Sequence, residues 1–381
     1  MESLMALRNG GYDSEIHLFT DSSLPAMNPT LLTYYIAGKI GLDELFPYGD
    51  DMCSKYGVNQ HKGSKVTRLD AMGKTVENAD GLKMSYDHCV VCSGASPTIP
   101  AGYDGDNVFT IRAIHNATAL KERVSAGKSA LVVGASMIGV KVVEALVVQG
   151  MDVHLTDTQE QVFPLVAHLS CARLIEQQLR KKGVDLYLGT EYPPLSQYDL
   201  VVICAGVKPN IGFIDTSQVE TDSGILVDKY MRTSCEGLYA AGDCTEMRGS
   251  DVRLAAPGLW ASARYMGRAA GWNIAGKNEP CAEVVRHNIT RFFDTEFVTI
   301  GEMHSGDSFT EMEAKDRYCR ISWKDNRISG VNLINMPEIS GVLRSLINKD
   351  LGLSPIALGM VFKRYPQIRE AFLEREVNAG S

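Results

Sequence analysis

The sequence has 381 residues, of which 45% are hydrophobic, enough to bury the cores of two or three domains. Its 38 Lys and Arg residues are outnumbered by 46 Asp and Glu residues, and the net charge of -8 is spread without long runs of one sign. This balance provides no basic surface for a polyanion, so we expect no nucleic-acid partner.

The sequence carries no secretory or membrane-spanning pattern. No basic segment followed by an apolar run precedes the fold, and the most apolar stretch, ALVVGASMIGVKVVEALVV, is interrupted by Lys141 and Glu144. We therefore expect no membrane span and a cytoplasmic location. The nine cysteines are scattered through apolar or mixed surroundings, which favours reduced thiols over a disulfide framework.

The first segment is typical of the second half of a β-α-β unit. Apolar residues recur at helical spacing over residues 4–7, a glycine pair ends the helix, and Ile16 and Leu18 predict a strand that leads to Asp21. The strand and glycine-rich turn that usually open such a unit do not precede this helix in the sequence. Either the chain is clipped, or the site that these elements would build is unused.

A complete β-α-β unit begins at Ser129. The stretch SALVVGASMIGVKVVEALVVQGMDVHLTD combines an apolar strand, a turn of small residues, a helix ended by Gly150 and a second strand that ends at Asp157. The later stretches KKGVDLYLG and YDLVVICAGVKPN add the strands expected of a doubly wound parallel sheet. We assign residues 109–229 to one dinucleotide-binding domain.

The GASMIG turn of this unit predicts a pyrophosphate site. Gly134 allows the tight turn, and Gly139 lets the helix pack closely on the strand. The helix N-terminus at Ser136, Met137 and Ile138 offers free N–H groups to the phosphates. Ser136 replaces the usual middle glycine, and its Cβ is expected to lower the affinity.

Asp157 strengthens this prediction, because it lies about twenty residues further on, at the end of the second strand. Its carboxylate can accept hydrogen bonds from an adenosine ribose. The following residues, TQE, offer no arginine for a 2′-phosphate, so the sequence favours NADH over NADPH. The alternative is a purely structural β-α-β turn with a solvated aspartate.

Two further regions complete the predicted organisation. Residues 1–108 and 230–285 form a second, discontinuous dinucleotide-binding domain, and residues 286–381 form a C-terminal α+β domain with alternating strands such as EFVTIGE. The fold class is therefore α/β, with two Rossmann-like three-layer domains built on parallel sheets, plus this tail. An apolar stripe on residues 339–347 predicts a helix that packs on the tail's own sheet; the alternative is a docking surface, for example for a homo-oligomer.

Four stretches together resemble one family: YDHCVVCSGASPTIP, ALVVGASMIGVKVVEAL, DLVVICAGVKPN and TSCEGLYAAGDCTE. Their order and spacing are similar to those of the FAD-dependent pyridine nucleotide-disulfide oxidoreductases, in the branch of NADH oxidases, rubredoxin and ferredoxin reductases and NADH-dependent nitrite reductases. The resemblance covers nearly the whole chain, and LYAAGDC is its most specific part. It implies the cofactors FAD and NAD(H).

The resemblance also implies binding roles for individual residues. Gly242 and Asp243 would lie at the ribityl or pyrophosphate region of FAD, and Ser93, Gly94 and Ala95 would lie close to the flavin. Asp21 would bind the adenosine ribose of FAD, Val66 would lie near its adenine, and Trp260 would lie beneath the flavin. Gly206 would contact the nicotinamide nucleotide. Each has a structural alternative: Asp243 as a helix cap, the glycines as turn residues, and Val66 and Trp260 as core.

The sequence departs from the family at its start. Family members begin with a strand and a G-x-G-x-x-G turn, so about fifteen to twenty residues are missing by comparison. That turn cradles the FAD pyrophosphate in the family, so we expect this chain to bind FAD weakly. We favour a truncated start over a degenerate subunit, because Asp21, Ser93 and Asp243 keep their family places.

Two more departures concern the acceptor and the nicotinamide. Disulfide-reducing relatives place a redox cysteine soon after the first acidic strand, but here no cysteine lies between Asp21 and Cys53. Thiol chemistry is therefore not expected. Lys141 stands where relatives usually carry a glutamate beside the nicotinamide; it either points into that cleft or is a solvated helical lysine.

The sequence thus predicts a flavin-dependent NAD(P)H oxidoreductase that passes electrons from NADH through FAD to a second acceptor. That acceptor is an electron-transfer protein, a partner subunit, a quinone-like molecule or oxygen. Hydride transfer needs no protein acid, base or nucleophile, and we assign no catalytic residue and no metal site. The alternative is a non-catalytic scaffold subunit of a larger redox complex that has lost FAD binding.

Overall fold

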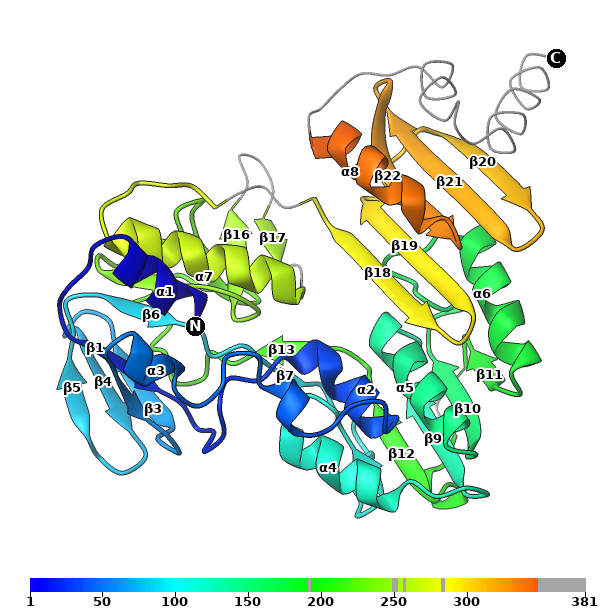
Figure 1. Cartoon of the computed structure of the whole chain (residues 1–381), viewed down its shortest axis with the longest axis horizontal. Helices are drawn as coiled ribbons and strands as arrows, with labels where there is room; N and C mark the ends of the chain where they lie inside the picture. Colours follow the sequence, from blue (N-terminus) through cyan, green and yellow to red (C-terminus); the bar gives the residue numbers. More distant parts are fainter. Residues whose placement is uncertain (191–192, 249–252, 256–257, 282–284, 349–381) are drawn as a thin grey trace. The chain divides into compact units, whose positions relative to one another are not determined.

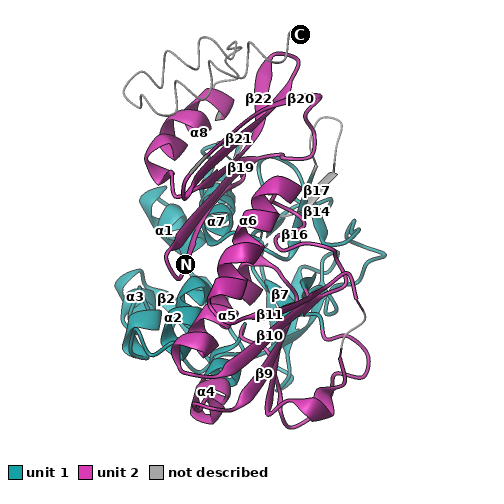
Figure 2. Cartoon of the chain, turned by 90° about the vertical axis from the view of Figure 1, so that its right-hand side faces the viewer, with its two compact units in different colours: residues 1–98, 112–117, 206–283 teal, residues 99–111, 118–205, 284–381 magenta. Residues whose placement is uncertain are grey.

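The computed structural model describes residues 1–190, 193–248, 253–255, 258–281 and 285–348 (Figure 1). The chain divides into two units, coloured separately in Figure 2: unit 1 comprises residues 1–98, 112–117 and 206–283, and unit 2 comprises residues 99–111, 118–205 and 284–381. Each unit is built from segments that are far apart in the sequence.

The elements of unit 1 are short strands and three helices in the first segment, with one long helix at the end. They are α1 (Glu2–Asn9), β1 (Ile16–Phe19), α2 (Leu32–Ile36), α3 (Met52–Lys55), β2 (Val58–His61), β3 (Val66–Asp70), β4 (Thr75–Asn78), β5 (Lys83–Ser85), β6 (Cys89–Val91), β7 (Ala95–Pro97), β13 (Val207–Pro209), β14 (Ile225–Val227), β15 (Leu238–Ala240), β16 (Thr245–Arg248), β17 (Arg253–Ala255) and α7 (Trp260–Ile274).

The elements of unit 2 are a parallel α/β layer followed by an antiparallel sheet. They are β8 (Val108–Phe109), β9 (Ser129–Val133), α5 (Met137–Val148), β10 (Asp152–Asp157), α6 (Leu169–Lys181), β11 (Asp185–Leu188), β12 (Leu200–Ile203), β18 (His287–Phe292), β19 (Thr295–Gly301), β20 (Ser308–Ala314), β21 (Arg317–Lys324), β22 (Arg327–Ile334) and α8 (Ser340–Asn348). Helix α4 (Ile114–Arg123) spans the boundary of the two units.

Helices α1 and α7 of unit 1 pack closely, and glycine makes this possible. A Cβ added to Gly271 would lie 2.4 Å from the carbonyl oxygen of Ser3, so no larger residue fits there without a shift of the backbone. Glu2 is 6% exposed and forms ion pairs with Arg264 and Arg268 of α7. The first helix predicted from the sequence is therefore a packed element of the domain.

The parallel strand pairs described in unit 1 lie in three separate sheets, one of which contains the pair β14–β16. Strand β1 pairs with β2, and β6 pairs with β15, both in parallel. The meander β3-β4-β5 is antiparallel. The predicted strand at residues 16 and 18 and the strand before Ser93 are thus both present, in different two-stranded sheets.

Unit 2 contains the complete parallel sheet that the sequence predicts from Ser129 onward. Its order is β11-β10-β9-β12-β8, with every pair parallel. Residues 130–133 of β9 are fully buried, as expected for a central strand covered on both faces. The order places β9 and β12 side by side, so the GASMIG turn leaves the middle of the sheet.

The C-terminal part of unit 2 is an antiparallel sheet of order β18-β19-β22-β21-β20. Helix α8 packs on one face, where Ile339 and Leu343 join Cys319 and Ile321 of β21 in one apolar cluster. The apolar stripe therefore packs on its own sheet, although Val342 is 44% exposed. The predicted fold class is confirmed: Rossmann-like α/β layers with parallel strands, and a C-terminal α+β module.

Candidate functional site

The GASMIG turn of unit 2 requires glycine at two positions. Gly134 has φ +109°, and an added Cβ would lie 2.4 Å from the carbonyl oxygen of Cys204, directly after the neighbouring strand β12. An added Cβ on Gly139 would lie 1.9 Å from the carbonyl oxygen of Gly134. The turn is therefore pressed against β12 and the first turn of α5, as predicted for a β-α-β unit that binds a dinucleotide.

Replacement of Gly139 by alanine should loosen this turn. We expect the free energy of unfolding to fall by about 1–3 kcal/mol, because the added methyl group would be overpacked against a backbone carbonyl. We also expect a weaker affinity for NADH. Gly341, in the first turn of α8, has open space around it and is the matched control. Gly341→Ala should be neutral or slightly stabilising in urea unfolding. Equal behaviour of the two variants would contradict the packing role of Gly139.

Ser136 caps the N-terminus of α5, and the backbone N–H groups of the next two residues have no acceptor within the helix. The Ser136 hydroxyl oxygen accepts a hydrogen bond from the Gly139 N–H at 3.2 Å and donates to the Cys204 carbonyl at 3.3 Å. The N–H groups of Met137 and Ile138 lie in the first turn, where a helix offers no internal acceptor. Ile138 is 53% exposed, so this helix end is accessible to an anion.

Asp157 lies beside the same turn. One carboxylate oxygen accepts a hydrogen bond from the Ala135 N–H at 2.7 Å, and the other accepts one from the Gln159 N–H at 2.8 Å. Each oxygen has a second lone pair, so the carboxylate can still receive ribose hydroxyls. The half-buried acid, the glycines and the open helix end fit the adenosine and pyrophosphate groups of NAD(H).

Lys141 occupies neither of the two positions expected for it. Its side chain is 12% exposed, forms an ion pair with Glu144 on the same helix and donates a hydrogen bond to the Arg291 carbonyl of β18 at 2.6 Å. The other Glu144 oxygen accepts the Phe293 N–H at 3.1 Å. Lys141 therefore joins α5 to the C-terminal sheet.

In unit 1 a second polar cluster forms after the parallel strands β6 and β15. Asn210 forms two hydrogen bonds with Ser93 in the β6–β7 turn. Its backbone carbonyl accepts one from the Ser93 hydroxyl at 2.6 Å, and its side-chain amide nitrogen donates one to the Ser93 carbonyl at 3.0 Å. Its amide oxygen accepts the Ser96 hydroxyl at 2.7 Å. Gly94, next to Ser93, has φ +68°, which favours glycine at this turn.

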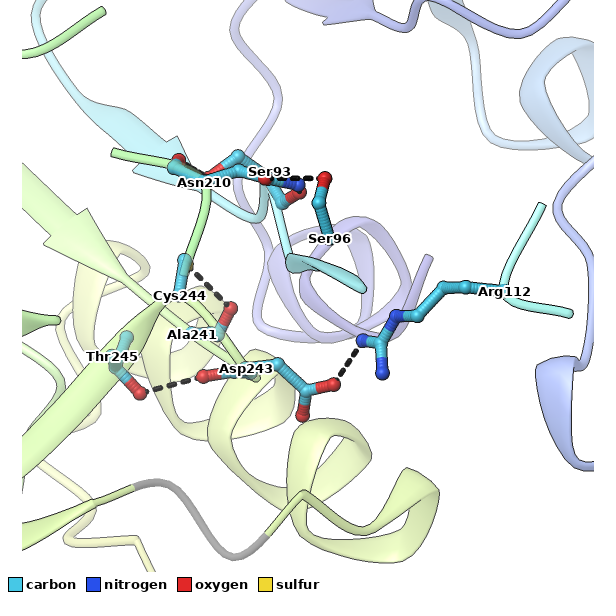
Figure 3. Close-up of polar contacts among 9 residues, drawn as sticks. Ser93, Ser96, Arg112, Asn210, Ala241, Asp243, Cys244 and Thr245 are labelled. Carbon is cyan, nitrogen blue, oxygen red and sulfur yellow. Dashed lines mark hydrogen bonds and ion pairs between the residues drawn. The ribbon is translucent and has the colours of Figure 1, made fainter. Parts of the chain in front are cut away.

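Asp243 follows β15, the parallel partner of β6. Its carboxylate forms an ion pair with the Arg112 guanidinium, and the two side chains point toward one another in Figure 3. Gly242 has φ +86°, and its carbonyl accepts the Thr245 hydroxyl at 2.7 Å. A Cβ on Gly242 would contact Ala263 of α7 at 3.5 Å, so the first turns of α7 lie next to this acid.

These residues fit an FAD that is held by its polar chain. Asp243 is an acceptor for hydroxyls and Arg112 is a donor for phosphates. A Cβ added to Gly94 would lie 4.0 Å from a terminal nitrogen of Arg112, so the β6–β7 turn lies beside the guanidinium. The Ser262 hydroxyl, in the first turn of α7, is buried without a hydrogen-bond partner among the described residues.

The other predicted FAD residues belong to different elements of unit 1. Asp21 is exposed, two residues after β1; Val66 is half-buried at the start of β3; and Ala95 is buried at the start of β7. Trp260 is the first residue of α7, with the Arg264 guanidinium 4.8 Å from its ring centroid. No hydrogen bond or ion pair joins these four side chains to Asp243 among the contacts of the described residues.

Gly206 has φ +106° and belongs to unit 1, and its carbonyl accepts the Thr98 N–H at 2.9 Å. The sequence prediction missed Arg112 and Asn210. Arg112 follows the short strand β8 and lies in none of the four family-like stretches, and Asn210 ends one of them, DLVVICAGVKPN, but was assigned no role. Only the folding of distant segments onto β6 and β15 brings them to Asp243 and Ser93.

The described part of the chain bears on the predictions about membranes, metals and cysteines. No helix among the described residues is long and apolar enough to cross a membrane. In the same residues, no group of three or more His, Cys, Asp or Glu side chains is placed to hold a metal ion. All nine cysteines are free thiols.

Comparison with known proteins gives a consistent result. The family model described as pyridine nucleotide-disulphide oxidoreductase matches residues 2–267. The chain is 28% identical over 385 residues to the NADH-dependent phenylglyoxylate dehydrogenase subunit epsilon of Aromatoleum evansii, covering 93% of this chain and 90% of that protein. It is 22% identical over 346 residues to the NADH-rubredoxin oxidoreductase of Clostridium acetobutylicum, covering 89% of each.

Solved structures share the fold. The crystal structure of that Clostridium acetobutylicum oxidoreductase matches with a TM-score of 0.80 at 20% identity, over 94% of this chain and 96% of that one. The covalent complex of putidaredoxin reductase with putidaredoxin matches with a TM-score of 0.86 at 21% identity, over 93% and 91% of the two chains.

Proposed function

The chain belongs to the pyridine nucleotide-disulphide oxidoreductase family, and we propose that it carries electrons between NADH and a protein partner through FAD. It is an oxidoreductase that uses FAD and NAD(H). The observation that carries the proposal is the presence, in one chain, of two polar sites at the ends of parallel strands: the GASMIG turn with Asp157, and Asp243 with Ser93.

The residues divide into two binding sets. NADH is bound by Gly134, Ser136, Met137, Ile138, Gly139 and Asp157, with Gly206 at the nicotinamide nucleotide. FAD is bound by Asp21, Val66, Ser93, Gly94, Ala95, Gly242, Asp243 and Trp260, and we add Arg112 for its phosphates. When bound, FAD supplies the hydride acceptor and passes electrons on singly or in pairs.

The protein's part in this reaction is to bind and orient. The α5 N-terminus and Asp157 fix the adenosine half of NADH, and Asp243 and Arg112 fix the polar chain of FAD. Neither set contains a side chain that must give or take a proton in hydride transfer. No cysteine lies between Asp21 and Cys53, so a thiol at that position does not relay electrons here.

We propose a protein as the second redox partner. Two relatives support this: one is named as a subunit of an NADH-dependent dehydrogenase, and another as an oxidoreductase for rubredoxin. The partner is then an iron-sulfur protein or a subunit of a cytoplasmic enzyme complex. Oxygen and quinone-like molecules are the alternatives.

The test compares electron acceptors under single-turnover conditions. The protein, reconstituted with FAD, is reduced anaerobically with NADH and mixed with a ferredoxin, a rubredoxin, a quinone or oxygen. We expect an iron-sulfur protein to reoxidise it at least about tenfold faster than oxygen does, as the docked geometry of a specific partner requires. Reoxidation by oxygen at the same rate as by every protein tested would contradict a protein partner.

Replacement of Asp157 by serine tests the NADH site. The Asp157 carboxylate accepts hydrogen bonds from the ribose hydroxyls of NADH and repels the 2′-phosphate of NADPH. The variant lacks this carboxylate, so we expect the preference for NADH over NADPH to fall by about tenfold. Equilibrium titration with both nucleotides measures this ratio. Asp185→Ser, at the start of the adjacent strand β11, removes the same charge at the end of the sheet opposite to Asp157 and should leave the ratio unchanged.

A scaffold subunit without FAD is the second candidate, and one observation favours it. The parallel strands described in unit 1 are divided among three separate sheets, whereas those of unit 2 form one continuous sheet. If the protein is a scaffold subunit without FAD, the purified protein is colourless, and saturating FAD produces no bound flavin spectrum.

A further inference from the structure

A polar cavity of about 220 Å³ lies in unit 2, away from the GASMIG turn. It is lined by His168 at the start of α6, by the loop from Met303 to Phe309, and by Arg320 and Ser322 of β21. Its residues play no part in the function proposed above.

The alternation of β21 explains why this cavity is polar. Cys319 and Ile321 point to the apolar cluster under α8, so Arg320 and Ser322 point to the opposite face of the sheet. On that face the sheet meets the segment before α6: Asn332 accepts the His168 N–H at 2.8 Å and donates to the Val166 carbonyl at 2.8 Å. The cavity lies beside these contacts.

Arg320 is the central group. Its side chain is 7% exposed, its guanidinium carbon lies 3.6 Å from the ring centroid of Phe309, and one terminal nitrogen lies 3.5 Å from Glu311. The Nε atom is buried and has no hydrogen-bond partner among the described residues. Such an unpartnered donor is destabilising unless a water or an ion is bound to it.

The remaining polar groups of the lining are mainly donors. The Nδ1 atom of His168 accepts the Ser170 N–H at 3.3 Å, so the neutral ring carries its proton on Nε2, which is a donor. His304 and the Ser308 hydroxyl add donors at the exposed loop, whereas the Ser322 hydroxyl is used by the Met303 carbonyl at 3.1 Å. Asp307, also exposed, is the one carboxylate among the lining residues that the structure describes.

We infer that this cavity is a binding site for a small oxyanion such as a phosphate group, held by the Arg320 guanidinium and His168. Arginine matches oxyanions with its planar set of N–H donors. The cavity is smaller than the pockets that hold drug-sized ligands, which favours a small anion over a whole nucleotide. Asp307 at the rim opposes the anion and limits its affinity.

The test measures binding of inorganic phosphate by calorimetry at constant ionic strength. We expect saturable binding that persists with saturating NADH. Asp307→Asn should bind phosphate about two- to fivefold more tightly, because a like charge is removed near the surface. Asp316 is exposed and lies just beyond the other end of β20, far from the cavity. Asp316→Asn removes the same charge there, so this variant should bind phosphate with the affinity of the parent.

Arg320→Lys keeps a charge beside Glu311 and removes Nε, so phosphate affinity should fall by at least about tenfold. Thermal unfolding of each variant shows whether it is folded. Absence of saturable binding, displacement of phosphate by NADH, or equal affinities of Asp307→Asn and Asp316→Asn would overturn the inference.

Discussion

Replacement of Asp243 by alanine is expected to weaken FAD binding by at least about a hundredfold. The change removes the acceptor for the polar chain of FAD and leaves Arg112 without its carboxylate. Hydrogen bonds to charged groups are worth about 1.5–3 kcal/mol each, and loss of one such bond at the upper end accounts for this factor. Equilibrium dialysis with FAD, followed by its visible absorbance, measures the affinity.

A matched control is available on the same pair of strands. Asp87 is exposed and precedes β6, at the end of the strand opposite to the β6–β7 turn. Asp87→Ala removes the same charge and should bind FAD as the parent does. If both variants lose FAD equally, the effect is on the stability of the domain and Asp243 has no specific role; circular dichroism distinguishes the two explanations.

Lys141→Met is expected to lower the free energy of unfolding by about 3–5 kcal/mol. Lys141 and Glu144 have side chains that are 12% and 8% exposed, and loss of the ammonium leaves the Glu144 carboxylate in a largely dry site. The contact to the Arg291 carbonyl is lost as well. Urea unfolding measures the change, and the affinity for NADH should stay within about twofold, because Lys141 faces the C-terminal sheet.

Lys181, in the last turn of α6, provides the comparison. It is exposed on a helix of the same unit, so Lys181→Met should change stability by less than about 0.5 kcal/mol. A strongly reduced NADH affinity in Lys141→Met at unchanged stability would place Lys141 at the nicotinamide and contradict the role given to it here.

Local patterns predicted the central β-α-β unit well. The strand at residues 129–133, the turn at Gly134 and Gly139 and the acid at Asp157 are neighbours along the chain, and Gly139 is constrained by the Gly134 carbonyl of the same turn. The period of the apolar residues fixes such elements, because one face must be buried in each. The same logic predicted that the helix after residue 339 packs on its own sheet.

Contacts between distant segments could not be predicted in this way. Arg112 meets Asp243 across 131 positions, and Lys141 meets the Arg291 carbonyl across 150. A lysine in a helix gives no sequence signal of whether it is solvated, in a cleft or paired, since that depends on which element packs beside it. The buried Arg320 is similar: alternation in β21 predicts its face, but the polar nature of the facing surface comes from the segment before α6.

The most direct test of the account is an anaerobic titration of the FAD-reconstituted protein with NADH, followed by visible absorbance. Two sites in one chain that hold FAD and NADH for hydride transfer predict bound flavin whose visible absorbance bleaches with about one equivalent of NADH, and more slowly with NADPH. A protein that binds NADH but retains no flavin, or a bound flavin that NADH does not reduce, would contradict it.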